Sequence, residues 1–207
     1  MKLTFFFDYS SPFAYLGATA VEKLAKDHDA DLVWHPFLLG ALFKSIGTPI
    51  VPLQAMSPAK QKYQYKDIMR WAAHREAAFN WPSRFPMNTV KALRMTEQLE
   101  GADVPKLALP IFRAYWAEDR DINDPEALKE IANDAGFDAE KLLAGTQEQA
   151  IKDQLRARTE KAVDVGVPGA PCFLVHRDDE DQGMLFWGQD RFEMIGRALE
   201  GWRPDCG

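Results

Sequence analysis

The sequence predicts an α/β fold in which a small frame of strands and helices carries a large all-helical insertion. A strand, a helix and a second strand fit within the first 40 residues, and only helical patterns fill the middle. Two further strands and a helix close the chain. We therefore expect residues 1–54 and 164–207 to form two halves of the frame, with residues 55–163 inserted between them.

The opening βαβ unit is compact. Residues 2–7, KLTFFF, have the aromatic and β-branched content of a strand. Pro12 suits the first position of a helix, where its missing N–H is not needed, and apolar residues then recur at helical spacing as far as Asp27. Residues 31–37, DLVWHPF, are the second expected strand, and the crossover between the two strands should be right-handed.

The middle of the chain consists of helical patterns separated by polar or Pro-rich loops. Ser57 and Pro58 have the residue types of an N-cap and a first helical position. Asp124 and Pro125 start another helix that Gly136 ends. The expected helices cover 57–75, 89–99, 107–117, 124–136, a short segment from Asp138, and 147–163.

The frame resumes after the insertion. We expect a third strand over Cys172 to Val175, a polar hairpin turn over 176–183 and a fourth strand over 184–188. A closing amphipathic helix follows, with Asp190 as its N-cap.

Composition excludes several classes of protein. The 207 residues are 46% hydrophobic and 27% charged, which is ordinary for a globular chain. A net charge of −6 argues against nucleic-acid or acidic-membrane binding, and no apolar run is long enough for a membrane span. The N-terminus does not have the pattern of a secretion signal, so we expect a cytoplasmic protein. Two cysteines give neither a disulfide framework nor a metal site.

The segment FDYSSPFAYL, residues 7–16, places hydroxyl groups where the first strand meets the first helix. The start of a helix presents free N–H groups and the positive end of the helix dipole, so it favours an anion. The Ser11 hydroxyl can donate a hydrogen bond to an anion held there. The alternative is that Ser11 only caps the helix, and Ser10 is a rival hydroxyl.

Three motifs carry a family resemblance: FDYSSPFAYL near the start, GVPGAPCFLV over 166–175, and FWGQDRF over 186–192. LFKSIG and RFPMNT support it in the middle of the chain. With these motifs the chain resembles the 2-hydroxychromene-2-carboxylate isomerases, which are similar to kappa-class glutathione transferases and to DsbA-type oxidoreductases. The resemblance runs nearly end to end and implies a thioredoxin-like fold with an inserted all-helical domain.

The resemblance gives the opening segment a chemical role. Redox members of this fold carry a CxxC motif where this chain has Ser11-Pro12-Phe13-Ala14, so a dithiol cycle cannot occur here. It implies instead that glutathione supplies the thiol, and that the serine directly before the proline, Ser11, ionises it. Lowering a thiol pKa by about 2 units takes about 2.7 kcal/mol. A helix start contributes about 0.3–1 kcal/mol, up to about 2, and a hydrogen bond to the anion about 1.5–3.

Two other motifs imply a clamp for the tripeptide. By resemblance Pro171 is cis and turns the Ala170 backbone toward a peptide-like ligand, and Asp190 accepts a bond from the ligand ammonium. Gln189 stands where relatives usually have Asn. The resemblance assigns glutathione binding to Ser11, Lys60, Ala170, Pro171, Gly188, Gln189, Asp190 and Arg191.

The resemblance also implies an aromatic 2-oxo acid as substrate, interconverted between the chromene and the trans-o-hydroxybenzylidenepyruvate. Lys44 is expected to hold its carboxylate, while Phe85 and Asn88 line the pocket. For each lysine the alternative is a solvated surface charge. The sequence does not decide whether Lys60 or its neighbour Lys62 has the proposed role. Trp187 is either an aromatic wall or a core residue.

The remaining expectations are brief. Cys172 is a small buried residue without a redox role, and the four histidines form no motif. Relatives suggest a homodimer. Two rival functions stay open: a kappa-type glutathione transferase or peroxidase, and a non-catalytic thioredoxin-like module that binds thiols or peptides.

Overall fold

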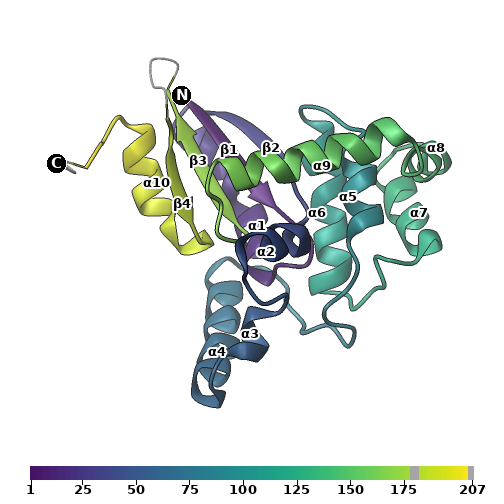
Figure 1. The fold of residues 1–207 in the computed structure, drawn as a ribbon, viewed down its shortest axis with the longest axis horizontal. Helices are drawn as coiled ribbons and strands as arrows, with labels where there is room; N and C mark the ends of the chain where they lie inside the picture. Colours follow the sequence, from purple (N-terminus) through teal and green to yellow (C-terminus); the bar gives the residue numbers. More distant parts are fainter. Residues whose placement is uncertain (178–181, 205–207) are drawn as a thin grey trace.

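A mixed four-stranded sheet forms the centre of the frame (Figure 1). The computed structural model describes residues 1–177 and 182–204. The strand order is β2-β1-β3-β4, in which β1 and β2 are parallel and the other neighbours are antiparallel. The strands are β1 Lys2–Phe7, β2 Asp31–Pro36, β3 Cys172–His176 and β4 Met184–Trp187. This arrangement confirms the expected order of strands in the frame and brings the first and third strands side by side.

Helices make up every other regular element that the structure describes. Helix α1, Pro12–Asp27, joins β1 to β2, and the short 3₁₀ turn η1, Gln189–Arg191, leads into α10, Phe192–Leu199. Between β2 and β3 the chain forms α2 Leu39–Ile46, α3 Pro52–Ala55, α4 Pro58–His74, α5 Val90–Thr96, α6 Asp103–Trp116, α7 Pro125–Asp134, α8 Ala139–Gly145 and α9 Gln149–Asp164.

The inserted helices surround the frame unevenly (Figure 1). Helix α9 packs against β2 and α2, and α6 packs against α1. Helices α3 and α4 project from the lower end of the frame in this view, whereas α5 to α8 gather on the right. The division of the chain at residues 55 and 163 stays a prediction. Among the described residues, no helix combines the length and the apolar character that crossing a membrane requires.

Several sequence predictions need correction. Helices α2 and α3 were not expected, and α6 begins at Asp103 rather than residue 107 because Pro105 lies in its first turn, where a missing N–H is tolerated. Asp190 is not the N-cap of α10: it lies within η1, and Arg191 holds the cap position. The expected hairpin turn over 176–183 lies partly outside the described residues.

An aromatic cluster on the sheet forms the middle of the core. Phe5 is fully buried, with its ring centroid 5.0 Å from that of Trp34 and 5.2 Å from that of Phe173. The indole N–H of Trp116 donates to the carbonyl of Tyr9 over 2.8 Å in the buried interior. This bond attaches α6 to the turn that follows β1, so the insertion and the frame share one core.

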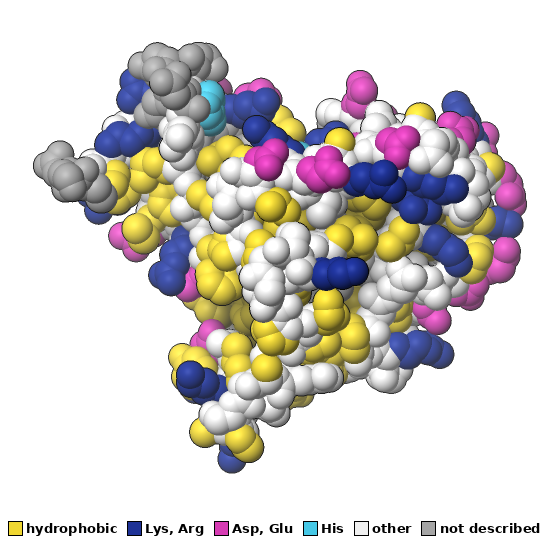
Figure 2. Space-filling view, viewed as in Figure 1, with side chains coloured by type: hydrophobic (Ala, Val, Ile, Leu, Met, Phe, Trp, Pro, Cys, Tyr) yellow, Lys and Arg dark blue, Asp and Glu magenta, His cyan; other side chains and the backbone are white. Residues whose placement is uncertain are grey.

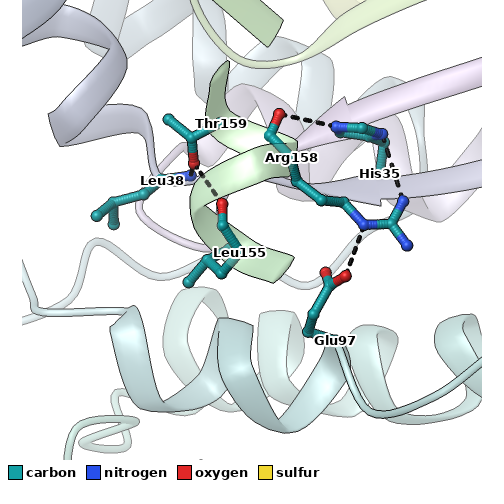
Figure 3. Close-up of polar contacts among 6 residues, drawn as sticks. All are labelled: His35, Leu38, Glu97, Leu155, Arg158 and Thr159. Carbon is teal, nitrogen blue, oxygen red and sulfur yellow. Dashed lines mark hydrogen bonds and ion pairs between the residues drawn. The ribbon is translucent and has the colours of Figure 1, made fainter. Parts of the chain in front are cut away.

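A polar cluster fastens α9 to the sheet and to α5 (Figure 3). The Arg158 guanidinium donates from Nε to Glu97 Oε1 over 2.7 Å and from Nη1 to His35 Nδ1 over 3.4 Å. Because a guanidinium only donates, His35 carries its proton on Nε2, which donates to the Arg158 carbonyl over 3.0 Å. Burial lowers the pKa of His35 to about 4, so the ring is neutral in the folded protein at neutral pH.

We predict that His35 makes the protein less stable in mild acid. Its folded pKa of about 4 lies below the usual value, so the unfolded chain binds more protons between about pH 6.5 and 4. The stabilisation is complete above this interval and is lost as the pH falls through it, at up to about 1.4 kcal/mol per pH unit. Burial raises the pKa of Glu97, which opposes the trend.

Urea denaturation at pH 7.5 and pH 5 tests this prediction. His35→Asn should lose less stability than the wild type between these pH values, because the variant has no ring to protonate. His74→Gln on α4 is the matched control and should follow the wild type. Equal losses in His35→Asn and the wild type would contradict the assignment.

Candidate functional site

A cavity of about 720 Å³ opens where the start of α1 meets the ends of β3 and β4. This volume is in the usual range for small-molecule sites. One wall is polar and includes the β1–α1 turn, residues 168–171 and residues 187–191; the opposite wall comes from α2, α3, α4 and the loop over 81–89. Figure 2 shows hydrophobic side chains around the hollow between α4 and the rest of the chain.

Ser11 lies on the polar wall and is nearly fully buried. Its Oγ accepts a hydrogen bond from the Ala14 N–H over 3.2 Å, so it is the N-cap of α1. The same hydroxyl donates to the Ala170 carbonyl over 2.8 Å. Capping is therefore confirmed, and it does not exclude a second role. The hydroxyl has a single proton, so Ser11 must release the Ala170 carbonyl before it can donate to a ligand.

The first turn of α1 leaves one backbone donor unused. Pro12 has no N–H, the Ser11 N–H donates to the Asp8 carbonyl over 3.1 Å, and the Ala14 N–H donates to Ser11. In the described part of the chain the N–H of Phe13 makes no hydrogen bond, and Phe13 lines the cavity. At the positive end of the helix dipole this N–H is a ready donor for an anion.

The Ala170–Pro171 peptide bond is cis, which confirms that part of the sequence prediction. Pro171 lies against α1: a Cβ added to Gly17 would come 3.5 Å from its ring. The Pro171 carbonyl accepts the Gly188 N–H over 3.0 Å. The proline therefore joins the start of α1 to the turn after β4. A second cis bond, Phe85–Pro86, lies on the opposite wall and was not predicted.

The turn after β4 is held by an arginine that the sequence analysis missed. The Arg75 guanidinium donates to the Gln189 carbonyl over 2.9 Å and to its amide oxygen over 3.3 Å, and it lies 4.3 Å from the ring centroid of Phe192. Gln189 is almost fully buried, and both of its oxygens bind Arg75. Asp190 and Arg191 form a 3.6 Å ion pair at the cavity wall.

The structure separates the predicted substrate residues into two groups. Phe85 and Asn88 line the cavity. Lys44 on α2 and Lys60 on α4 have exposed side chains and are not among the lining residues. Among the described lining residues Arg191 is the only cation, so the geometry gives no support to a carboxylate-binding role for Lys44 or a glutathione-binding role for Lys60.

Two further residues illustrate what the sequence left open. Trp187 is 59% exposed and lines the cavity, so it is a wall residue rather than part of the core. Cys172 is fully buried, and burial raises the pKa of its thiol to about 12. The protein's own buried sulfur therefore stays protonated at neutral pH. Cys206 lies outside the described residues, within which no cluster of metal-ligating side chains occurs.

Comparison with known proteins defines the class. The sequence model of the DSBA-like thioredoxin domain matches residues 2–200. The chain belongs to this family, and the predicted thioredoxin-like fold is confirmed.

Particular relatives are similar over nearly their whole length. A 2-hydroxychromene-2-carboxylate isomerase of Sphingobium xenophagum is 26% identical over 198 residues, which cover 95% of this chain and 97% of the relative. The kappa 1 glutathione S-transferase of Homo sapiens is also 26% identical, over 94% of this chain and 88% of its own. The chain is thus related to glutathione transferases and isomerases.

Solved structures agree on the fold. A 2-hydroxychromene-2-carboxylate isomerase superposes with a TM-score of 0.84 at 23% identity, over 97% of this chain and 95% of that one. The cytosolic disulfide reductase DsbM from Pseudomonas aeruginosa, solved with GSH, has a TM-score of 0.68 at 16% identity, over 97% and 98%.

We predict that Gly188→Ala distorts the site. Gly188 has a φ of 109°, and an added Cβ would come 2.4 Å from Asp190 Oδ1. A side chain in this backbone region costs about 1–3 kcal/mol. Urea denaturation should show that the free energy of unfolding of Gly188→Ala is lower than that of the wild type by this amount. Gly40→Ala is the control, since its Cβ meets nothing within 4 Å and alanine favours a helix by about 0.5–1 kcal/mol. Equal stability of the two variants would refute the prediction.

Proposed function

We propose that this protein is a glutathione-dependent isomerase of 2-hydroxychromene-2-carboxylate-type substrates. The observation that carries the proposal is the start of α1, where Ser11 and Phe13, whose N–H is unused, line a cavity to which the described residues bring no ionised thiol. The names of several relatives, isomerase and glutathione transferase, support the same reading.

The cavity fits a tripeptide on its polar wall. The backbone at Ala170, next to the cis bond, and the turn at Gly188 can approach an extended peptide closely, because neither presents a large side chain. Asp190 offers an acceptor for an ammonium, and Arg191 offers a donor for a carboxylate. Gln189 contributes indirectly, since Arg75 holds its carbonyl and amide oxygen.

Residues of this chain would ionise and orient the thiol. Phe13 N–H is free to donate to a sulfur anion, and Ser11 Oγ can donate once it turns from the Ala170 carbonyl. A hydrogen bond to a charged group contributes about 1.5–3 kcal/mol and the helix start up to about 2, together enough to lower a thiol pKa by about 2 units. Bound glutathione would supply the thiolate that adds reversibly to the conjugated double bond. The addition leaves a single bond, about which rotation is easy, and elimination of the thiolate then restores the double bond.

The opposite wall would orient the aromatic part of the substrate. Phe43, Ile68 and Trp71 lie there with Phe85, and together they offer an apolar surface. Holding the ring against this surface places the reacting carbon near the start of α1, which is the contribution of proximity to catalysis.

One observation favours a second candidate, a kappa-type glutathione transferase. Among the described residues the apolar wall has no cation, because Lys44 and Lys60 do not line the cavity. A carboxylate would have to reach Arg191 on the polar wall, whereas an uncharged aromatic electrophile needs no such partner.

The homodimer, the cytoplasmic location and the physiological substrate stay predictions. Exposed apolar side chains on α4, with Tyr63 58% and Tyr65 49% exposed, are a surface that a second copy would cover.

We predict that Ser11→Ala retains glutathione binding and loses thiolate. The clamp at residues 170–171 and 188–191 stays in place, while the bound thiol pKa should rise by about 2 units without the hydroxyl donor. Calorimetry measures binding, and thiolate absorbance near 240 nm against pH measures ionisation.

Ser10→Ala is the matched control, because its hydroxyl also lines the cavity and has no role in this assignment. It should behave as the wild type. Failure of the wild type to bind glutathione would refute the proposed function.

We predict that Arg191→Gln separates the two candidate reactions. If Arg191 holds the carboxylate, the variant should raise the KM for a hydroxychromene carboxylate about tenfold, since a lost charged hydrogen bond costs about 1.5–3 kcal/mol. Conjugation of a chlorinated nitrobenzene should change less, because that substrate has no carboxylate and any loss of glutathione binding through Arg191 affects both reactions alike. Turnover of the nitrobenzene alone by the wild type would establish the transferase instead.

A further inference from the structure

Helix α2 begins without a cap from its own segment. Leu38 occupies the N-cap position, and its side chain cannot accept a hydrogen bond. Two distant side chains accept bonds from its first N–H groups instead. The Leu38 N–H donates to Thr159 Oγ1 over 3.0 Å, as Figure 3 shows, and the Leu39 N–H donates to Asp8 Oδ2 over 2.8 Å.

Asp8 joins three segments that form the cavity wall. Besides Leu39, its carboxylate accepts the Ser10 N–H over 2.9 Å and the Thr89 hydroxyl over 2.7 Å. Its backbone carbonyl accepts the Ser11 N–H. The turn that presents Ser11, the start of α2 and the loop at Thr89 therefore all meet at one side chain.

The Asp8 carboxylate has no counterion among the residues that the structure describes. It is 1% exposed, and this burial raises the pKa of Asp8. The hydrogen bonds from Ser10, Leu39 and Thr89 act in the opposite direction and favour the ionised carboxylate. The titratable groups that interact with it, Tyr9 and Tyr115, are buried phenols, and burial raises the pKa of both. A buried charge without a partner is costly, so its place on the cavity wall is informative.

We propose that Asp8 is a positioning residue that fixes the apolar wall on α2 relative to Ser11, and that its negative charge opposes ionisation of a thiol bound at Ser11. This inference rests on the proposed function. Phe43 and Ile46 reach the cavity from α2, so a shift at the start of α2 moves that wall. A negative charge near a thiolate raises the thiol pKa, which offsets part of the lowering by the start of α1.

The two effects can be measured separately. Glutathione reports on ionisation through its thiolate absorbance near 240 nm, and the ratio of the Kd values of glutathione and S-benzylglutathione reports on the apolar wall. Asp8→Asn removes the charge and should lower the bound thiol pKa by about 1 unit. Asp8→Asn should also weaken the binding of S-benzylglutathione about fivefold relative to that of glutathione, which is the loss expected when one helix cap is removed.

Thr159→Val is the matched control, since it removes the other distant cap of α2 and leaves Asp8 intact. Thr159→Val should weaken the binding of S-benzylglutathione relative to that of glutathione by a similar factor, and it should leave the pKa of the bound thiol unchanged. Thr89→Val should also weaken the binding of S-benzylglutathione, although the Asp8 charge remains. It replaces Asp8→Asn as the test of the apolar wall if circular dichroism shows that Asp8→Asn does not fold.

The outcomes distinguish the two proposals. No glutathione binding by the wild type refutes the proposed function. If the wild type binds glutathione as a thiolate, an unchanged thiol pKa in folded Asp8→Asn overturns the role of the charge. An unchanged Kd ratio in folded Asp8→Asn, or in Thr89→Val where Asp8→Asn does not fold, overturns the role of Asp8 in holding α2.

Discussion

The site depends on the contact between the start of α1 and the cis Ala170–Pro171 segment. One hydroxyl makes this contact: Ser11 Oγ caps the helix and donates to the Ala170 carbonyl. The contact brings residues 159 positions apart to the same cavity wall. It also sets a chemical condition, because a single proton cannot serve the carbonyl and a ligand anion together. A ligand that occupies the Ala170 backbone would release Ser11, so binding and ionisation would be coupled.

The insertion takes part in the site instead of only covering it. Helix α9 reaches the start of α2 through Thr159, and the same helix holds His35 and Glu97 through Arg158 (Figure 3). Helix α4 is followed by Arg75, which secures Gln189. The strands and α1 therefore provide the polar wall, and the helices between β2 and β3 both support it and supply the apolar wall.

The distribution of sulfur and charge explains why a borrowed thiol suits this cavity. Cys172 lies beside the cis proline, yet its burial raises its pKa to about 12, and no other described residue carries a thiol. The start of α1 has an unused N–H at Phe13 and a serine hydroxyl at its N-cap, and donors at a helix start lower the pKa of a thiol that lies there. Such a wall can stabilise an external sulfur without competing with one of its own.

The sequence by itself determined the order of the strands, the N-caps at Ser11 and Asp124 and the helix starts at Pro12 and Pro125, because these signals depend on neighbouring residues. The family motifs also led to the cis bond at Pro171. Tertiary structure alone decided that Lys44 and Lys60 lie outside the cavity, which contacts Arg75 and Asp8 make, and where α2 begins. Those contacts join residues tens of positions apart, and local patterns do not record which side chains packing brings together.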